Sequence, residues 1–196
     1  MQIDTDLLIA WGGVSKIYQR NEMVFSEGNF ARFYFQMIDG CVKMANINDD
    51  GKEFVQGVFY NGDSFGEPPL FLDEAYPASA IAIRDSVILK ISKESFLKIL
   101  KSYPSIQMDF LVAFSKRIFH KSKVNKGIAL EKPEHRILGF LDNFKKEHDK
   151  SGKMKVPFTR QEIANFTGLR VETVIRALSK MNKENKVSIV ERKLYY

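Results

Sequence analysis

The sequence predicts an α+β protein with a β-rich first half, a long central helix and a helical last part that ends in a small hairpin. Three observations predict this fold class. β-prone runs separated by tight-turn dipeptides fill much of the first hundred residues. Apolar residues recur at helical spacing after residue 92. The chain has 196 residues, a length that corresponds to one or two domains.

The first half contains short β-prone segments of similar length. We expect strands over residues 33–38, 41–47, 54–60, 78–83 and 87–91. Asp-Gly and Asn-Gly dipeptides follow or separate the first three, at 39–40, 50–51 and 61–62. Such dipeptides favour hairpin turns because both residues tolerate positive φ. Several strands joined by tight turns indicate an antiparallel barrel or sandwich.

After residue 92 the apolar spacing becomes helical, and Pro104 separates a short helix from a long one. From Ser105 to about Leu130 apolar residues recur every three or four positions, which predicts a helix about 38 Å long. Such a helix packs either on the β-rich part or against the same helix of a second chain. We favour a parallel homodimer. Its seam would contain Phe110, Phe114, Ile118, Val124 and Ile128.

Pro133 suits the first turn of a further helix. Its buried face should comprise Ile137, Leu138, Phe140, Leu141 and Phe144. The polar segment 145–155 that follows is predicted to be a loop.

Charge is divided unequally along the chain: the net charge of +6 combines −5 over residues 1–100 with +11 over residues 101–196. A basic half favours a polyanionic partner, and a solvated lysine-rich surface is the alternative. One cysteine and three scattered histidines exclude a disulfide framework, an iron–sulfur cluster or a structural zinc site within one chain. We therefore expect no bound metal. We also expect no enzymatic activity, because the sequence shows no nucleophile–base pair and no Gly-rich phosphate loop.

The N-terminal segment and the hydropathy pattern predict the compartment. Residues 1–6 are acidic and lack the basic-then-apolar order of a signal peptide. No apolar run is long enough to cross a bilayer as a helix. The expected protein is cytoplasmic, with no membrane partner.

Two short helices joined by a tight turn are predicted between residues 159 and 183. Thr159 and Glu162 have the spacing of a capping box, and Gly168 can adopt the left-handed conformation that ends the first helix. The second helix runs from about Arg170 to Lys183, with an inner face of Val174, Ala177, Leu178 and Met181. This is a helix-turn-helix, and residues 187–190 and 193–196 complete a hairpin wing.

The second helix carries the residues that we expect to read DNA bases. Arg176 suits guanine O6 and N7, Glu172 suits cytosine N4, and Ile175 can contact only a thymine methyl group; Val171 completes this set. Glu172 and Arg176 are four residues apart, so a surface ion pair is the alternative. Phosphate contacts from helix starts and exposed positions are expected at Thr159, Arg160, Gln161, Arg170, Thr173 and Lys180.

The segment from Thr159 to Ala164, with Gly168, Glu172-Thr173-Val174 and Arg176, resembles the helix-turn-helix of the Crp/Fnr (cyclic-AMP receptor protein / FNR) superfamily of bacterial transcription regulators. The segment from Tyr60 to Glu67, followed by Leu70-Phe71, resembles the phosphate-binding cassette of that superfamily's cyclic-nucleotide-binding β-roll. The likeness covers essentially the whole chain in the right order.

The resemblance implies three parts: an effector β-roll over residues 1–103, a dimerisation helix over 104–131 and a winged helix-turn-helix over 132–196. It implies a homodimer on a two-fold symmetric promoter, with the helix from Arg170 in the major groove of double-stranded DNA. The FNR-like pattern around Glu172 and Arg176 implies a T-G-A-type half-site core. RNA polymerase is a further candidate partner, although no signature of a polymerase-contacting surface stands out. A receptor module whose output is not DNA binding is the alternative function.

The sequence departs from the superfamily where its sensors hold a cyclic phosphate. Those sensors carry an Arg-Ser pair there, and this chain has Pro77-Ala78, so we expect cyclic AMP not to bind in the usual mode. Glu67, which in sensors bonds the ribose, could instead accept backbone amides at a turn. The candidate pocket would accept an uncharged effector or be filled by its own side chains, and we favour the second. Its residues are Phe65, Gly66, Glu67, Pro68, Leu70, Pro77, Ala78 and Ser79.

Overall fold

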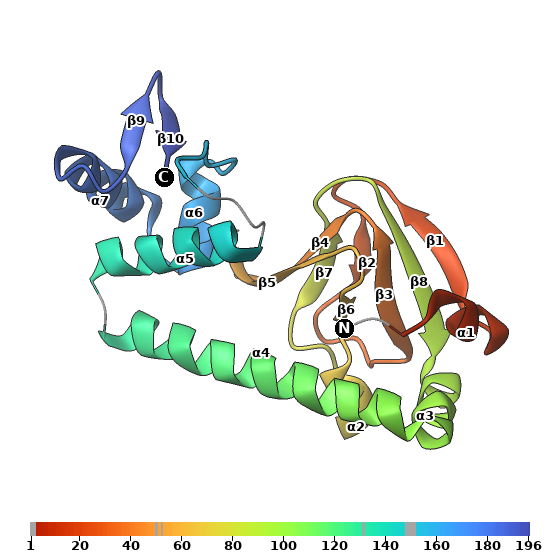
Figure 1. Cartoon of the computed structure of the whole chain (residues 1–196). Helices are drawn as coiled ribbons and strands as arrows, with labels where there is room; N and C mark the ends of the chain where they lie inside the picture. Colours follow the sequence, from red (N-terminus) through yellow and green to blue (C-terminus); the bar gives the residue numbers. More distant parts are fainter. Residues whose placement is uncertain (1–2, 50, 52, 131, 148–151) are drawn as a thin grey trace. The chain divides into compact units, whose positions relative to one another are not determined.

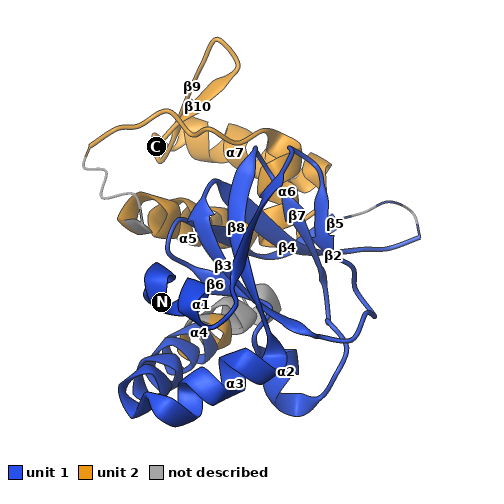
Figure 2. Ribbon diagram, turned by 90° about the vertical axis from the view of Figure 1, so that its right-hand side faces the viewer, with its two compact units in different colours: residues 1–118 blue, residues 119–196 orange. Residues whose placement is uncertain are grey.

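The computed structural model describes residues 3–49, 51, 53–130, 132–147 and 152–196, with the backbone alone for 120, 123–130 and 147. It confirms the α+β fold class, with antiparallel sheets first and helices after them. The chain divides into two compact units, residues 1–118 and 119–196 (Figure 2). The division falls within the long helix α4 (Pro104–Leu130), which therefore contributes to both units.

Unit 1 contains two four-stranded antiparallel sheets, ordered β1-β8-β3-β6 and β2-β7-β4-β5 (Figure 1). All five predicted strands are confirmed to within one residue at each end, as β3, β4, β5, β7 and β8. Strands β1, β2 and β6 escaped prediction because they are short and show no clear alternation of apolar residues. The strands are β1 Val14–Tyr18, β2 Met23–Phe25, β3 Phe33–Asp39, β4 Cys41–Ile47, β5 Glu53–Tyr60, β6 Ser64–Phe65, β7 Ser79–Ala82 and β8 Ser86–Ser92.

Glycines form two of the predicted turns. Gly40 and Gly62 both have positive φ, as expected after Asp39 and Asn61. Gly40 also lies so close to β8 that a Cβ atom there would be 2.6 Å from Cα of Ser86, so no side chain fits. The third predicted turn includes Asp50, which lies outside the described residues.

Side chains alternate across β3 and so build two cores. Phe35 points between the two sheets, where it joins Phe25, Phe65 and Tyr76. Tyr34 points to the other face, where helices cover the sheet. These are α1 (Thr5–Ala10), α3 (Lys93–Ser102) and the first turns of α4, whose buried residues include Leu8, Phe96, Ile99 and Phe110. Helix α2 (Pro68–Leu72) adds Leu70 to this second core.

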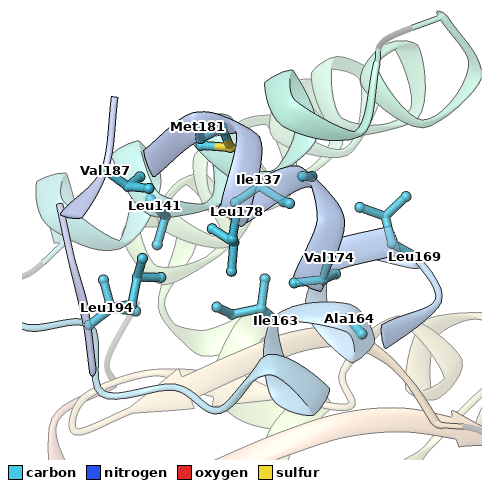
Figure 3. Close-up of a cluster of buried hydrophobic side chains, with 12 residues drawn as sticks. Ile137, Leu141, Ile163, Ala164, Leu169, Val174, Leu178, Met181, Val187 and Leu194 are labelled. Atoms are coloured by element: carbon cyan, nitrogen blue, oxygen red, sulfur yellow. The ribbon is translucent and has the colours of Figure 1, made fainter. Parts of the chain in front are cut away.

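Unit 2 packs helices α5 (Pro133–Glu147), α6 (Arg160–Thr167) and α7 (Val171–Lys183) around one apolar core (Figure 3). The predicted faces of α5 and α7 supply it: Ile137, Leu141, Val174, Ala177, Leu178 and Met181 are buried. The predicted wing is confirmed as β9 (Ser188–Val190) and β10 (Lys193–Tyr195), and an isolated bridge joins Lys155 to Tyr195. The predicted loop begins later than expected, because α5 continues to Glu147.

Among the described residues, no helix is both long enough and apolar enough to cross a membrane.

Candidate nucleic-acid interface and effector site

Helix α6 begins with the predicted capping box. Oγ1 of Thr159 accepts a hydrogen bond from the Glu162 amide at 3.1 Å, and the Glu162 carboxylate accepts from the Thr159 amide at 2.7 Å. Two amides at this end of the helix are therefore satisfied. The capping box fixes the start of the first helix of the motif.

The turn between α6 and α7 is built on Gly168. Its φ of 64° is left-handed, as predicted, and its amide donates to the Ala164 carbonyl. Ala164 itself is buried against the α7 side of the core (Figure 3). The guanidinium of Arg136, on α5, donates a hydrogen bond to the carbonyl of Thr167. A positively charged group therefore satisfies one of the carbonyls that the C-terminal end of α6 leaves without a helical partner. Sequence analysis did not identify Arg136, because it lies 31 residues before Thr167.

Helix α7 presents an exposed face whose residues have little to do with folding. Glu172, Ile175 and Arg176 are exposed, with 52% of Ile175 accessible. Neither Glu172 nor Arg176 has an ion pair or hydrogen bond with any described residue, so the surface-pair alternative does not apply in this structure. Val171 differs from the other three, since it packs partly against the core of unit 2. The face available for base contacts is thus Glu172, Ile175 and Arg176.

Lys180, a predicted phosphate contact, is already paired. Its Nζ lies 2.8 Å from Oε1 of Glu134 on α5. The hydrogen bond from Lys180 lowers the pKa of the Glu134 carboxyl, and the same contact raises the pKa of Lys180. A DNA phosphate would therefore compete with Glu134 for this ammonium. The sequence held no local signal of the pair, because 46 residues separate the two side chains.

The other candidate phosphate contacts lie at helix starts. Arg170 is the N-cap of α7 and is exposed, and Thr173 lies half-buried in the first turn. Arg160 is half-buried at the first position of α6, and burial lowers the pKa of its guanidinium. Gln161 donates to Asn165 at 2.9 Å along the same helix. The Thr159 hydroxyl oxygen serves the capping box, which leaves its proton for a phosphate oxygen.

In the β-roll, Glu67 is fully buried and paired with an arginine from α4. Nη1 of Arg117 lies 3.2 Å from each carboxylate oxygen of Glu67, and Nη2 donates to the Ser64 carbonyl at 2.6 Å. The guanidinium also lies over the ring of Phe59, 5.5 Å from its centroid. The alternative that Glu67 accepts backbone amides is therefore wrong, since the partner is a side chain 50 residues away.

The remaining candidate pocket residues have different surroundings. Pro68 and Pro77 are exposed, and Leu70 belongs to the helix-covered core. Oγ of Ser79 accepts from the Glu27 amide at 2.9 Å, and Ala78 is buried.

Aromatic rings fill the interior beside Glu67. Phe65 stacks on Phe35 with centroids 5.6 Å apart, and Phe25 stacks on Tyr76 at 3.7 Å. Gly66 has a φ of 73°, and a Cβ there would meet the Phe25 ring at 2.9 Å. Close ring packing of this kind makes the region part of the β-roll core.

Helix α4 requires a correction to the predicted dimer seam. Phe110 is 3% exposed and Phe114 half-buried, and both contact rings of the β-roll, including Phe96 and Phe71. They were assigned to the seam because the helix is apolar on more than one side. Ile118 is 69% exposed. Val124 and Ile128 have side chains outside the described residues. A second exposed set accompanies Ile118: Met108, Leu111, Val112 and Phe119.

Comparison with known proteins identifies both units. A model of the cyclic nucleotide-binding domain matches residues 15–103, and a model of the Crp-like helix-turn-helix domain matches residues 135–195. The chain belongs to the Crp/Fnr superfamily. This Crp/Fnr protein is therefore a DNA-binding transcription regulator, and a receptor with another output is not favoured.

The relatives of this Crp/Fnr protein are regulators. The transcriptional activatory protein AadR of Rhodopseudomonas palustris is 26% identical over 88% of this chain and 73% of its own length. The fumarate and nitrate reduction regulatory protein of Vibrio cholerae is 24% identical over 89% of this chain and 71% of its own length.

Solved structures share the fold. The c-di-GMP-responsive global regulator CLP of Xanthomonas campestris superposes with a TM-score of 0.84 at 22% identity, covering 96% of this chain and 95% of that one. FixK2 of Bradyrhizobium japonicum superposes with a TM-score of 0.77 at 21% identity, covering 93% of this chain and 91% of that one.

Proposed function

We propose that this regulator acts as a homodimer on a two-fold symmetric promoter site, reading each half-site with Glu172, Ile175 and Arg176. The observation that carries the proposal is the exposed and unpaired state of Glu172 and Arg176 on a helix whose opposite face is fully committed to the core. Exposed charged side chains on a helix can meet base edges without first breaking an internal ion pair or hydrogen bond.

Base reading follows from the donors and acceptors on this face. The Arg176 guanidinium can donate two hydrogen bonds to guanine O6 and N7, and the Glu172 carboxylate can accept from cytosine N4. Ile175 offers only a methyl surface, which suits thymine. Arg170 and Thr173 at the start of α7, with Thr159, Arg160 and Gln161 at the start of α6, would hold flanking phosphates. This division favours a T-G-A-type half-site core.

The dimer would form through the exposed face of α4. Met108, Leu111 and Ile118, with Ser115 between them, recur at intervals of three, four and three residues, which is the spacing of a coiled-coil seam. Oγ of Ser115 donates to the Leu111 carbonyl at 2.8 Å, so its hydroxyl can enter an apolar interface without losing a water partner. We therefore place the interface on this face, beside the one that Phe110 and Phe114 use.

Cyclic AMP is not required in this proposal. Pro77-Ala78 offers no cation to a cyclic phosphate, Arg117 already neutralises Glu67, and aromatic rings pack beside the pair. Displacing Arg117 would leave the fully buried carboxylate without a partner, at a cost of several kcal/mol. Regulated transcription by RNA polymerase, in the cytoplasm where promoter DNA lies, would then depend on the amount of protein or on another signal.

Selection of bound duplexes from a random pool, with and without 1 mM cyclic AMP, tests the proposal. We expect a palindromic consensus whose half-sites are centred about 10 bp apart, enriched equally in both pools. The Arg176→Ala variant, selected in parallel, should lose the guanine that Arg176 contacts while keeping the palindrome. A consensus without two-fold symmetry, or enrichment only with cyclic AMP, contradicts the proposal.

A further inference from the structure

A hollow of about 470 Å³ lies in unit 2 at the C-terminal end of α7, between that helix, the end of α5 and the wing. Four separate segments supply its walls: Lys145 from α5, Lys153, Asn182 and Lys186 at and after the end of α7, and Tyr195 and Tyr196. Its size is within the range of sites for small organic ligands.

Among the described residues, the lining of the hollow contains three lysines and no carboxylate side chain. Lys153 has no polar partner among the described residues, and Lys145 is held over the Tyr196 ring, 4.7 Å from its centroid. Lys186 is the partly neutralised member, since its Nζ lies 2.6 Å from Glu184. Ammonium groups gathered around one hollow repel each other, and a bound anion relieves that repulsion.

Two polar side chains of the lining have internal hydrogen bonds. Oδ1 of Asn182 accepts from the Ile189 amide at 2.8 Å, which leaves both amide hydrogens of Asn182 for a ligand. The hydroxyl of Tyr196 donates to Asp142 at 2.5 Å, which locks the ring in place beneath Lys145. Lysine ammonium groups and the Asn182 amide around one hollow suit an anion that accepts several hydrogen bonds, and two tyrosine rings beside it suit an attached planar group.

From this arrangement we propose that the hollow binds a small phosphate-bearing molecule of nucleotide size. Lys145, Lys153 and Lys186 would hold the phosphate, together with the Asn182 amide. The site is distinct from the proposed DNA-reading face, because Asn182 lies ten residues along α7 from Glu172, about 15 Å by helical rise. In a helix-turn-helix the N-terminal residues of the second helix meet the bases, so the hollow lies at the end directed away from them.

Calorimetry on the full chain with inorganic pyrophosphate, and separately with ADP, tests the site without DNA. We expect saturable binding of either probe, one molecule per chain. The Lys153→Gln/Lys186→Gln variant should weaken binding at least tenfold. The matched control, Lys146→Gln/Lys155→Gln, removes two neighbouring exposed lysines of the same unit that do not line the hollow, and should weaken binding less than threefold.

A second experiment, with DNA, distinguishes a free ligand from the DNA backbone as the source of the phosphate that these lysines bind. The salt dependence of DNA affinity should have the same slope in the Lys153→Gln/Lys186→Gln variant as in the unmodified protein. Three results overturn the proposal: no saturable binding of either probe, equal weakening in the control, or a slope reduced by about one for each lost phosphate contact. The last result would assign these lysines to DNA, and failure of any kind would leave the reading of bases by α7 untouched.

Discussion

Arg176 is the single side chain whose loss should most affect DNA recognition and least affect folding. It is exposed and has no polar partner among the described residues. Arg176→Ala should weaken binding to the selected duplex by about 1–3 kcal/mol, or roughly 5- to 150-fold, while the urea midpoint stays unchanged. Fluorescence anisotropy with labelled duplexes measures the first quantity. Equal affinity for the selected duplex would refute the assigned role.

The ion pair between Glu134 and Lys180 should make the stability of the protein depend on pH. Lys180 lowers the pKa of Glu134 below its ordinary value of 4.5, so the pair stabilises the folded state above that pH and is lost as the pH falls through the lowered value. Glu134→Gln should therefore lower the free energy of unfolding at pH 7, and the difference from the unmodified protein should disappear once the pH has fallen below the lowered pKa of Glu134. Urea titrations at a series of pH values measure it. A difference that persists in acid would point to packing instead of charge.

The same variant should bind DNA more tightly. Removing the carboxylate frees Lys180 for a phosphate and removes a repulsive charge beside DNA, so Glu134→Gln should steepen the salt dependence of affinity by about one unit of slope. Lys180→Ala in the Glu134→Gln background is the control and should remove the gain for all sequences alike. A gain confined to one sequence would contradict a phosphate role for Lys180.

At the scale of elements, the sequence predicted the structural features that are determined by residues close to one another along the chain. The capping box at Thr159, the left-handed Gly168 and the inner face of α7 were all predictable, since each is set by local spacing. Long-range pairs were not. Arg117 and Glu67 meet only because α4 passes beneath the β-roll, and nothing near either residue in the sequence indicates the other.

The two faces of α4 show the limit of apolar periodicity. Phe110 and Ile118 lie on the same helix and were assigned to one stripe, yet the first is buried in the β-roll and the second is exposed. Periodicity shows which residues avoid water, and on a helix apolar around most of its circumference it cannot show which face meets which partner. The exposed spacing of Met108, Leu111 and Ile118 was present in the sequence but was obscured by the larger phenylalanines.

Substitutions on the two faces of α4 should therefore have opposite effects. Ile118→Glu should yield a folded monomer, because it introduces a charge into the proposed interface and touches nothing in the β-roll. Phe110→Ala should keep the dimer and lose about 3–5 kcal/mol of stability through the cavity it leaves. Sedimentation equilibrium and urea unfolding together distinguish the two. An Ile118→Glu protein that remains dimeric would place the interface elsewhere.

The Arg117–Glu67 pair joins α4 to the β-roll and should be costly to break from one side only. Arg117→Met should destabilise the chain by about 3 kcal/mol, because a fully buried carboxylate loses its partner. Glu67→Gln combined with Arg117→Met should recover most of that loss. Urea unfolding of the unmodified protein and the two variants measures the effect. Equal stability of the single and double variants would show that the pair acts only through packing.

At the scale of the whole molecule, the chain combines an acidic first half with a basic second half, and the basic half carries α7, the helix that we propose reads DNA. A two-fold symmetric dimer fixes the distance between its two α7 helices, so the phase of the two half-sites on the duplex should matter as well as their sequence. Adding 5 bp between the half-sites turns one of them to the opposite side of the duplex and should abolish dimer binding. A mobility-shift series with 0, 5 and 10 added base pairs tests this. Equal affinity at 5 bp would exclude a rigid pair.

Helix α4 packs one face on the β-roll and exposes a second apolar face, and this restricts how its length can change. Inserting one residue between Phe114 and Ile118 turns the rest of the helix by about 100°, so that the exposed apolar side would no longer continue in register. An insertion of seven residues returns the face to nearly its original direction, with a lag of about 20°. Length variants of this helix should therefore keep the interface when the inserted residues complete nearly whole turns, as seven do, and lose it when they leave the face turned by about 100°, as one does.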